Sequence, residues 1–474
     1  MKNTKKIFAV ILSAVTIFSC LTFGAGALYA DKDWEDYYAS YMDEGMGILF
    51  QCGSDESERN LSWYSPLFAG NSYAEISENP DMSNAKKYNA SFVITESADR
   101  SNKVTFKNLE EGKTYYYRCV TGDDKSEIYS FDTVKGNAFT AMYVTDIHVS
   151  RKQDEMENPL VHQSYTVDYV VNEASEKEKL DLVISAGDQA SYGDRKEYES
   201  LVASPLIKSI PFSLCVGNHD RKGYAYKFFN NNPNKYKSGV SSLIGNDYWY
   251  VKGNVLFLVY DSNCKAASTH RTFTKKAIEA NPDVKWRVAV IHHDMYGRLT
   301  SGRLEDSNEN RRPVFVPIFD EFAIDLVLLG HSHYYTVSNV MYNGEVSENI
   351  EGNSVTDAKG SVYMVSGSIN RPKNIESASS TPLTETTSVG CQQDGVVYNL
   401  IDFSDDSIEI KSYNLDEDAP FNTLTINKTT QKGGHPDYEE PSNAAVERSK
   451  FEFLAVFTEF GEGIAGIWKT YFDS

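Results

Sequence analysis

The chain has 474 residues, a formal net charge of -21, 41% hydrophobic residues and 24% charged residues. These values are typical of a globular polypeptide with more than one hydrophobic core, and they exclude disordered, fibrous and small disulfide-rich proteins. The acidic balance also argues against non-specific binding of nucleic acid, because most of this surface would repel a phosphate backbone. A phosphate-bearing ligand therefore needs a local positive centre.

Residues 1–30 have the pattern of a secretory signal peptide. A start with three lysines precedes the apolar run 7–21, and the small residues 25–27 suit a cleavage site. We therefore expect a secreted protein. The alternative is a cell-surface lipoprotein with a lipid attached at Cys20, but Phe18 fits poorly where a small residue is expected. No later stretch has the ~20 uninterrupted apolar residues that cross a bilayer.

The six cysteines are widely spaced and form no C-x-x-C pair, which excludes a cysteine-rich metal site. Cys52 and Cys119 could form a disulfide between two strands. Buried free thiols, which behave as small hydrophobic side chains, are the favoured interpretation.

Residues 44–135 contain about seven short runs that are rich in Tyr, Phe, Val and Ile and are separated by Gly, Asn, Asp and Ser. This pattern predicts a β-sandwich of about seven strands. Around Tyr115 the segment resembles the corner of a fibronectin type III-like sandwich, where a tyrosine hydroxyl ties a strand to the preceding loop. The predicted strands are 47–52, 60–64, 73–76, 90–95, 103–106, 114–120 and 127–131.

Residues 138–415 have a different pattern, in which apolar β-rich runs alternate with helical periodicity at 160–174 and 271–280. Most gaps between the runs are long enough for the crossover helix that parallel strands require. Five apolar runs each end in a polar cluster: 141–144, 180–186, 212–216, 287–291 and 326–329. Later strands, predicted at 361–366, 396–403 and 407–413, should complete a second sheet.

Six of the nine histidines lie in the polar clusters that follow the five runs. In open α/β sheets ligands bind beyond the carboxyl ends of the strands, so the clusters should converge. Together with two aspartates and an asparagine, the imidazoles suit two borderline divalent metal ions, and one carboxylate can bridge both. The residues concerned are Asp146, His148, Asp188, Asn218, His219, His292, His293, His331 and His333.

In chain order the clusters are D-x-H, G-D, G-N-H-D, H-H and G-H-S-H, and this ordered set resembles the calcineurin-like metallophosphoesterase superfamily. The sandwich before it is similar to that of the purple acid phosphatase branch. The resemblance implies a four-layer α/β/β/α domain behind the all-β sandwich. It also implies that Asp146, His148 and His333 hold one metal and Asn218, His292 and His331 the other, with Asp188 shared.

The resemblance further implies catalytic roles for two neighbouring residues. His219 would contact the scissile phosphate and help to protonate the leaving oxygen, and Asp220 would orient His219. From the residues alone, purely structural roles remain possible for three of these side chains. Asp188 could be a turn residue, Asn218 a helix cap and Asp220 the cap of the following helix.

His292 and His293 are adjacent, so their side chains should point in opposite directions and only one should bind metal; the family pattern favours His292. The second cluster departs from the purple acid phosphatases, where a tyrosine three residues after the aspartate binds ferric iron. Here the tyrosine is Tyr192, one position later, and His148 stands where those enzymes have glycine. This departure favours two divalent ions (manganese, zinc or iron) over a coloured ferric centre.

The expected function is that of a secreted binuclear phosphatase, which hydrolyses phosphomonoesters by in-line attack of a hydroxide that bridges the two metals. The partner would be a small phosphate ester, with no nucleic-acid binding beyond a possible nucleotide substrate. A phosphodiesterase or nucleotidase with the same site is the alternative, as is a catalytically inert surface-binding protein. Residues 436–474 form a linker and an apolar tail, which we expect to dock on the body or on a partner or membrane surface.

Overall fold

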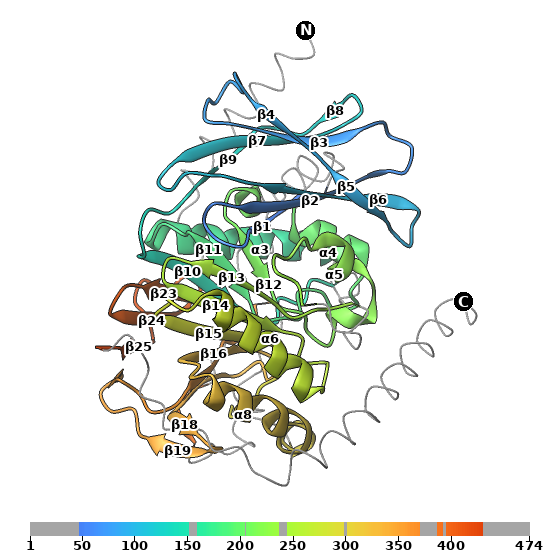
Figure 1. The fold of residues 1–474 in the computed structure, drawn as a ribbon. Coiled ribbons are helices and arrows are strands. Elements are labelled where there is room, and N and C mark those ends of the chain that lie inside the picture. Colours follow the sequence, from blue (N-terminus) through green and yellow to red (C-terminus); the bar gives the residue numbers. More distant parts are fainter. Residues whose placement is uncertain are drawn as a thin grey trace, which may run out of the picture.

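The computed structural model describes residues 47–150, 159–203, 205–236, 244–297, 301–369, 386–391 and 395–429. A smaller β unit stands above a larger α/β unit in Figure 1. The predictions made for residues 1–30 and 436–474, and for Cys20, lie outside the described residues. Within these residues, no helix is long and apolar enough to span a membrane.

The β unit is a sandwich of two sheets with a largely aromatic core. Trp63, Tyr117 and Phe131 are buried between the sheets. As predicted, Tyr115 Oη accepts a hydrogen bond from Glu110 N at 2.9 Å. One sheet holds β1 (Leu49–Cys52), β2 (Arg59–Pro66), β6 (Asp99–Phe106) and β5 (Ser91–Ile94); the other holds β4 (Lys86–Asn89), β3 (Ser72–Ser77), β7 (Thr114–Thr121), β8 (Asp124–Lys125) and β9 (Tyr129–Asp132). Each predicted run contains a strand, whereas the short polar strands β4 and β8 were not predicted.

The α/β unit is built on two large sheets, and the first of these continues the sandwich sheet. Its order is β20-β25-β24-β23-β10-β11-β12-β1-β2-β6-β5, and that of the second is β13-β14-β15-β16-β21-β17-β22. The first sheet adds β10 (Phe139–Val144), β11 (Leu182–Ser185), β12 (Phe212–Leu214), β20 (Ser354–Thr356), β23 (Val397–Phe403), β24 (Ser407–Asn414) and β25 (Asn422–Asn427). The second comprises β13 (Tyr248–Lys252), β14 (Val255–Tyr260), β15 (Trp286–Ile291), β16 (Leu326–Leu329), β17 (Tyr335–Ser338), β21 (Val362–Val365) and β22 (Thr387–Cys391). A small separate hairpin pairs β18 (Val340–Tyr342) with β19 (Glu345–Glu348).

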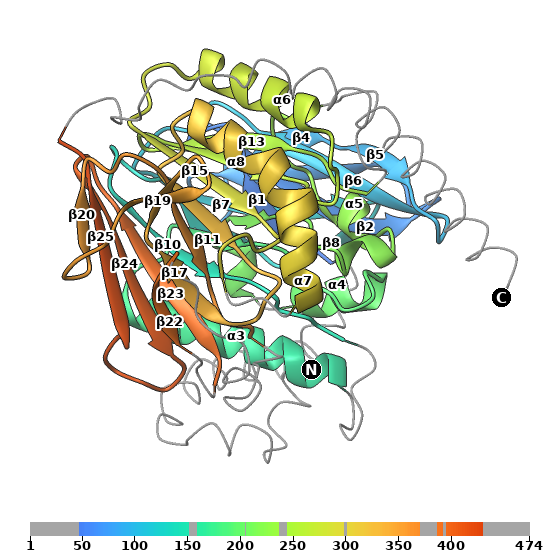
Figure 2. The same cartoon turned by 90° about the horizontal axis from the view of Figure 1, so that it is seen from below.

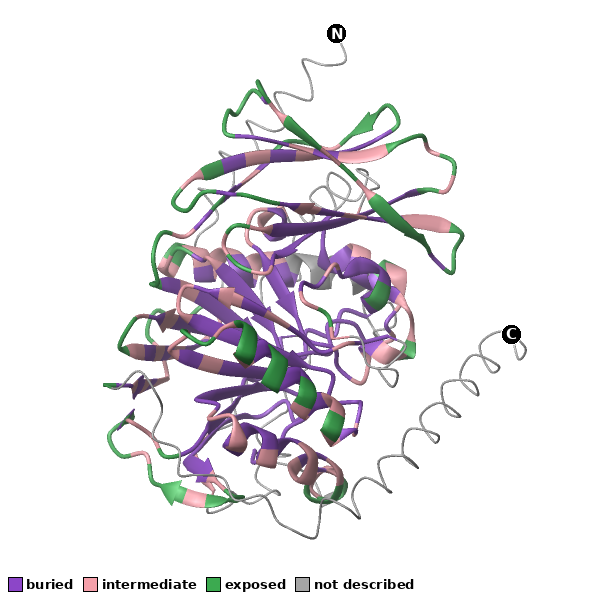
Figure 3. Cartoon of the chain, in the orientation of Figure 1, coloured by how far each residue is buried: buried purple, intermediate pink, exposed green. Residues whose placement is uncertain are grey.

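Helices cover the outer faces of both sheets, which gives the expected four layers (Figure 2). On the first sheet lie α3 (Pro159–Lys177), α4 (Arg195–Leu201) and α5 (Ala225–Phe229); on the second lie α6 (Ala267–Ala280), α7 (Ser301–Asp306) and α8 (Arg312–Glu321). Val171, Tyr198 and Phe229 anchor the first group of helices, and Phe273 and Phe319 anchor α6 and α8. Apolar side chains of both sheets meet between them, and the strands there are almost wholly buried (Figure 3).

Two parts of the predicted layout are wrong. The hairpin of β23 and β24 pairs with β10 of the first sheet, with Phe403 opposite Phe139, and does not complete the second sheet. β25 pairs with β24, so the α/β unit extends past residue 415. Alternating apolar residues indicate that a run is a strand, but they do not indicate which sheet will accept it. The interpretation of Cys52 and Cys119 as free buried thiols agrees with the structure.

The sandwich and the α/β unit share a buried ion-pair network as well as a sheet. β1 runs parallel to β12, with Gln51 opposite Phe212. Glu56 of the sandwich pairs with Arg59 and with Lys252 of β13, whose Nζ lies 3.0 Å from Glu56 Oε2. Both cations are buried. Burial alone would raise the pKa of Glu56, but Arg59 and Lys252 outweigh burial and lower the pKa to about 2.

We predict that Glu56→Gln lowers the free energy of unfolding at pH 7 by about 3–5 kcal/mol, because it leaves two buried cations without their carboxylate. The folded pKa lies below the ordinary value of 4.5, so this stabilisation is complete above that pH and is lost as the pH falls toward 2. Urea unfolding at pH 7 and pH 4 measures the difference, which should shrink at pH 4. Glu78→Gln, which breaks an exposed pair with Lys113, is the control and should cost less than about 1 kcal/mol. Equal losses in the two variants at pH 7 would contradict the prediction.

Candidate metal centre

The polar clusters meet at the carboxyl ends of β10, β11, β12, β15 and β16, as the sequence predicts. Backbone hydrogen bonds join their loops: Asp146 N donates to Gly187 O at 2.9 Å, and Gly330 N donates to His292 O at 2.8 Å. The two sheets are also linked here, since His331 N donates to Asp146 Oδ2 at 2.8 Å. The five clusters therefore form a single site.

One group of three candidate ligands consists of Asp146, His148 and His333, all buried. Asp146 Oδ1 is buried and accepts no hydrogen bond, yet it faces both imidazoles, 3.1 Å from His333 Nε2 and 3.7 Å from His148 Nε2. The two Nε2 atoms lie 3.1 Å from each other. Two ring nitrogens and a carboxylate oxygen that converge in this way match the donor set of a borderline divalent ion.

The second group is centred on His292. Its Nε2 lies 3.1 Å from Asn218 Oδ1 and 3.2 Å from Asp188 Oδ2, while its Nδ1 lies 2.9 Å from Ala186 O. The carbonyl accepts a hydrogen bond from Nδ1–H, which leaves Nε2 to face the other ligands. The ring of His331 lies 5.3 Å from that of His292, between centroids.

Asp188 lies between the two groups. Its Oδ2 is 3.2 Å from His292 Nε2 of one group and 3.7 Å from His148 Nε2 of the other. The structure therefore brings together Asp146, His148, Asp188, Asn218, His292 and His333, whereas His331 adjoins this group through its ring, 5.3 Å from that of His292. The sequence alone also allowed Asp188 to be an ordinary turn residue.

Most of these ligands sit on a strained backbone. In the left-handed region, with φ between 49° and 74°, lie Asp146, His148, Asp188, His331 and His333. Residues other than glycine rarely adopt this conformation, which costs of order 1–3 kcal/mol each and occurs mainly at functional sites. The backbone bonds between the loops hold it in place here.

Two motif glycines leave room for ligands from other loops. A Cβ at Gly187 would lie 2.5 Å from His292 Nδ1, and one at Gly330 would lie 2.7 Å from Asp146 Oδ2. Any side chain at either position would therefore displace a candidate ligand. The glycines that precede Asp188 and His331 are thus explained by close approach across the site.

The charges of the histidines suit metal binding, because metals bind deprotonated ligands. Burial lowers the pKa of His148 to about 3, and burial together with His292 lowers that of His331 to about 2, so both rings are neutral at pH 7. For His292, Asp188 outweighs burial and raises the pKa to about 9. Against the effect of burial, His292 in turn lowers the pKa of Asp188 to about 2. A metal cation bound between Asp188 and His292 would replace the proton on His292.

His219 faces the same centre. One of its ring nitrogens lies within 4.8 Å of ligand atoms of His148 and Asp188, and its backbone N donates to Asp188 Oδ1 at 2.7 Å. Nδ1 lies 2.9 Å from Ser191 O and 2.7 Å from Lys222 Nζ. Burial lowers the pKa of this half-buried histidine. The predicted position of His219 beside the metal ligands is thus observed.

Asp220 has a different place from the one expected of a residue that orients the His219 ring. It is buried, and its two oxygens accept hydrogen bonds from Gly217 N at 2.8 Å, Asp188 N at 2.9 Å, Ala190 N at 3.1 Å and the Tyr198 hydroxyl at 2.9 Å. Burial and the nearby Asp188 raise its pKa to about 7. Asp220 therefore ties together the loops that carry Asp188 and Asn218.

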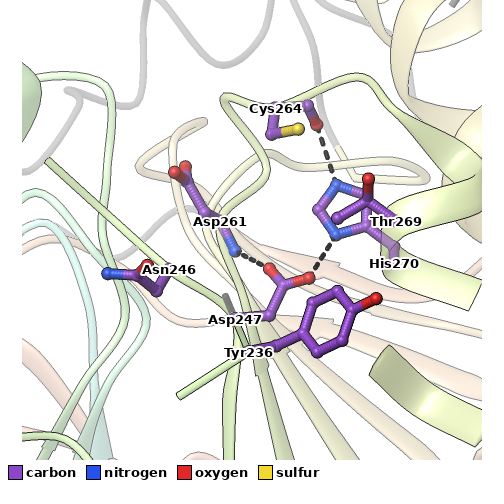
Figure 4. A pocket seen from close by; sticks show the side chains of 7 residues that line it. All are labelled: Tyr236, Asn246, Asp247, Asp261, Cys264, Thr269 and His270. Carbon is purple, nitrogen blue, oxygen red and sulfur yellow. Dashed lines mark hydrogen bonds and ion pairs between the residues drawn. The ribbon is translucent and has the colours of Figure 1, made fainter. Parts of the chain in front are cut away.

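Of the two adjacent histidines, His292 lies in the ligand group and His293 forms a hydrogen bond elsewhere. His293 Nδ1 lies 2.7 Å from the hydroxyl of Ser262, on the loop after β14. A buried ion pair supports that loop: Asp247 Oδ2 lies 2.6 Å from His270 Nδ1, and His270 Nε2 donates to Cys264 O at 3.0 Å (Figure 4).

The pocket beside this ion pair has a volume of about 10 Å³, room for about one water molecule.

The sequence gives no sign of the role of His270, because its partners are distant along the chain. Lys222 and Arg303, which contact His219 and His331, were also missed. Each stands in a segment with no recognisable pattern.

Both units match known families. Residues 139–335 match the family model of calcineurin-like phosphoesterases, and residues 47–133 match that of the purple acid phosphatase N-terminal domain. Purple acid phosphatase 1 of Ipomoea batatas is 24% identical over 297 residues, which cover 59% of this chain and 60% of that protein. Acid phosphatase type 7 of Mus musculus is 21% identical over 300 residues, which cover 56% and 63%. The chain spans about three fifths of the length of these relatives.

Two solved structures share the fold. Purple acid phosphatase PPD1 from yellow lupin (Lupinus luteus) seeds superposes with a TM-score of 0.64 at 14% identity, covering 81% of this chain and 74% of that one. PhoD superposes with a TM-score of 0.52 at 13% identity, covering 87% and 98%. The fold and the ordered polar clusters agree with the two family models that the chain matches. The chain therefore carries a calcineurin-like phosphoesterase domain behind a purple acid phosphatase N-terminal domain.

Proposed function

We propose that this protein is a secreted, binuclear metal-dependent phosphatase that hydrolyses phosphomonoesters by in-line displacement. The observation that carries the proposal is the position of Asp188 Oδ2, which lies 3.2 Å from His292 Nε2 of one group and 3.7 Å from His148 Nε2 of the other. The names of the relatives, purple acid phosphatase and acid phosphatase, support the same class of reaction. The pattern of residues 1–30 supports export, which N-terminal sequencing of protein from the culture medium would test.

The two metal positions follow from the two groups. Asp146, His148 and His333 would hold one divalent ion, Asn218, His292 and His331 the other, and Asp188 would touch both. When bound, the ions would supply positive charge for the phosphate and lower the pKa of coordinated water to about 7. The two ligating aspartates offset only half of the four positive charges, so the site attracts a phosphate dianion within a protein of net charge -21.

His219 is the residue we assign to the leaving oxygen. Ser191 O lies 2.9 Å from His219 Nδ1 and accepts a hydrogen bond from it when the ring is protonated, and Lys222 Nζ donates to the same oxygen at 3.3 Å. In the protonated ring Nε2 also carries a proton, which can pass to the leaving oxygen as the ester bond breaks and leave a neutral imidazole. Asp220 acts indirectly, because its hydrogen bonds fix the loops on either side of Asp188 and Asn218.

The proposal is tested by metal analysis of the purified protein together with hydrolysis of para-nitrophenyl phosphate and its bis ester. We expect two divalent ions per chain and faster cleavage of the monoester. We also expect no visible charge-transfer band, because Tyr192 is displaced by one residue from the iron-binding position and its ring lies 5.8 Å from Lys222 Nζ. Metal-loaded protein that cleaves neither ester would refute the proposal, and a coloured protein would refute the divalent assignment.

We predict that His219→Ala lowers kcat by about 10²–10⁴-fold, the usual contribution of a general acid, while the metal content stays the same. The loss should be larger for glycerol phosphate than for para-nitrophenyl phosphate, because an alkoxide needs a proton more than a nitrophenolate does. Steady-state kinetics with both substrates measures the two losses. Equal losses would indicate that His219 does not protonate the leaving group.

We predict that Asp188→Asn weakens the binding of both metals, because it removes the negative charge that the two cations share. Metal content after dialysis against a chelator should fall by about one ion or more per chain. The control is Asp181→Asn at the opposite end of β11, where the carboxylate accepts a bond from Thr140 N and does not reach the site. Two ions retained in Asp188→Asn would show that this carboxylate is only a turn residue.

A further inference from the structure

A helical stretch with three arginines lies against the loops that carry the second group of ligands. It comprises α7, a π-helical turn at Ser307–Arg311 and α8, which follow one another directly (Figure 2). Arg311 Nη1 donates to Ser262 O after β14, Arg312 Nε donates to Met295 O after β15, and Arg303 Nη1 donates to His331 O after β16. The stretch is therefore fastened to three successive strand ends beside the metal centre.

The three arginines differ in what balances their charge. Arg311 pairs with Asp306, with 2.9 Å between Nε and Oδ2, and is buried. Arg312 lies over the ring of Tyr296, 4.4 Å from its centroid. In the part of the chain that the structure describes, Arg303 has no carboxylate within 4.0 Å, and it is half-buried. Among the described residues, Arg303 is thus a cation with no carboxylate partner.

This cation stands next to a site that two bound divalent ions would make positive. The Arg303 guanidinium bonds to the backbone of His331 and, after burial and His292, contributes to the low pKa of the His331 ring. Two bound divalent ions would leave that site with a net positive charge, and a partly desolvated guanidinium beside it is unfavourable without an anion. A bound anion would remove that cost.

We propose that Arg303 binds a non-bridging oxygen of the substrate phosphoryl group and thereby selects phosphomonoesters over diesters; this inference rests on the proposed function. One N–H donates to His331 O, so the planar guanidinium is already oriented and keeps its other donors for a phosphate oxygen. A monoester offers an additional charged oxygen where a diester carries a second ester group. A charge-assisted bond to that oxygen therefore favours the monoester.

The test compares Arg303→Met and Arg303→Lys with wild type on para-nitrophenyl phosphate and on bis-para-nitrophenyl phosphate. In Arg303→Met we expect kcat/KM for the monoester to fall by about 10- to 100-fold, which is the range for the loss of one hydrogen bond to a charged group. We expect kcat/KM for the diester to fall by less than about 3-fold. Arg303→Lys should recover part of the monoester rate. Arg271→Met, which breaks a pair with Glu321 between α6 and α8, is the matched control and should change neither rate.

A merely structural role for Arg303 would lower both rates together, and an equal loss on the two esters with reduced metal content would overturn the inference. So would unchanged rates in Arg303→Met. If the wild-type protein cleaves neither ester, the proposed function is wrong. Binding of inorganic phosphate then tests separately whether Arg303 binds a phosphate oxygen. Calorimetric titration of phosphate should show a Kd at least about 10-fold higher in Arg303→Met, and an equal Kd would overturn the inference.

Discussion

The buried carboxylate of Asp188 is the group on which the rest of the site depends. It places a negative charge between two sets of imidazoles, and a charge in that position is stable only with cations or protons around it. Protonated His292, whose pKa Asp188 raises to about 9 against the effect of burial, is one such group. The surrounding structure keeps Asp188 in place: Asp220 accepts its backbone N–H, and Gly187 gives the His292 ring room to approach.

The strained backbone at five ligands requires a rigid support, which the two sheets provide. Tyr143 spans the gap between them directly beneath the site. Its hydroxyl, carried on β10 of the first sheet, accepts hydrogen bonds from Leu329 N at 3.1 Å, at the end of β16, and from Ser366 N at 3.2 Å, directly after β21 of the second sheet. The ligand loops of one sheet are thereby held at a constant distance from those of the other, as a two-metal site requires.

The N-terminal sandwich contributes to the site from a distance. Its side chains bind the end of α5 and the segment that follows it: Gln51 Nε2 donates to Asn230 Oδ1 at 2.8 Å, Asn60 Nδ2 donates to Asn231 O at 2.7 Å, and Ser101 Oγ donates to Phe228 O. This segment comes shortly after the loop of His219 and Asp220. Since the sandwich is joined to the α/β unit by a shared sheet, these bonds and the Glu56 ion pairs, it restrains one wall of the metal centre.

What the sequence by itself determined was local: strands are marked by apolar alternation, and the five polar clusters by their position just after strands. Because parallel strands present their carboxyl ends at one edge, that local information was enough to predict the convergence of Asp146, Asp188 and the histidines. The tertiary structure alone decided that β23 and β24 join the first sheet, that Asp220 ties loops together and that Arg303 reaches His331. Each of these depends on contacts between residues far apart in the chain, and such contacts leave no periodic trace in the sequence.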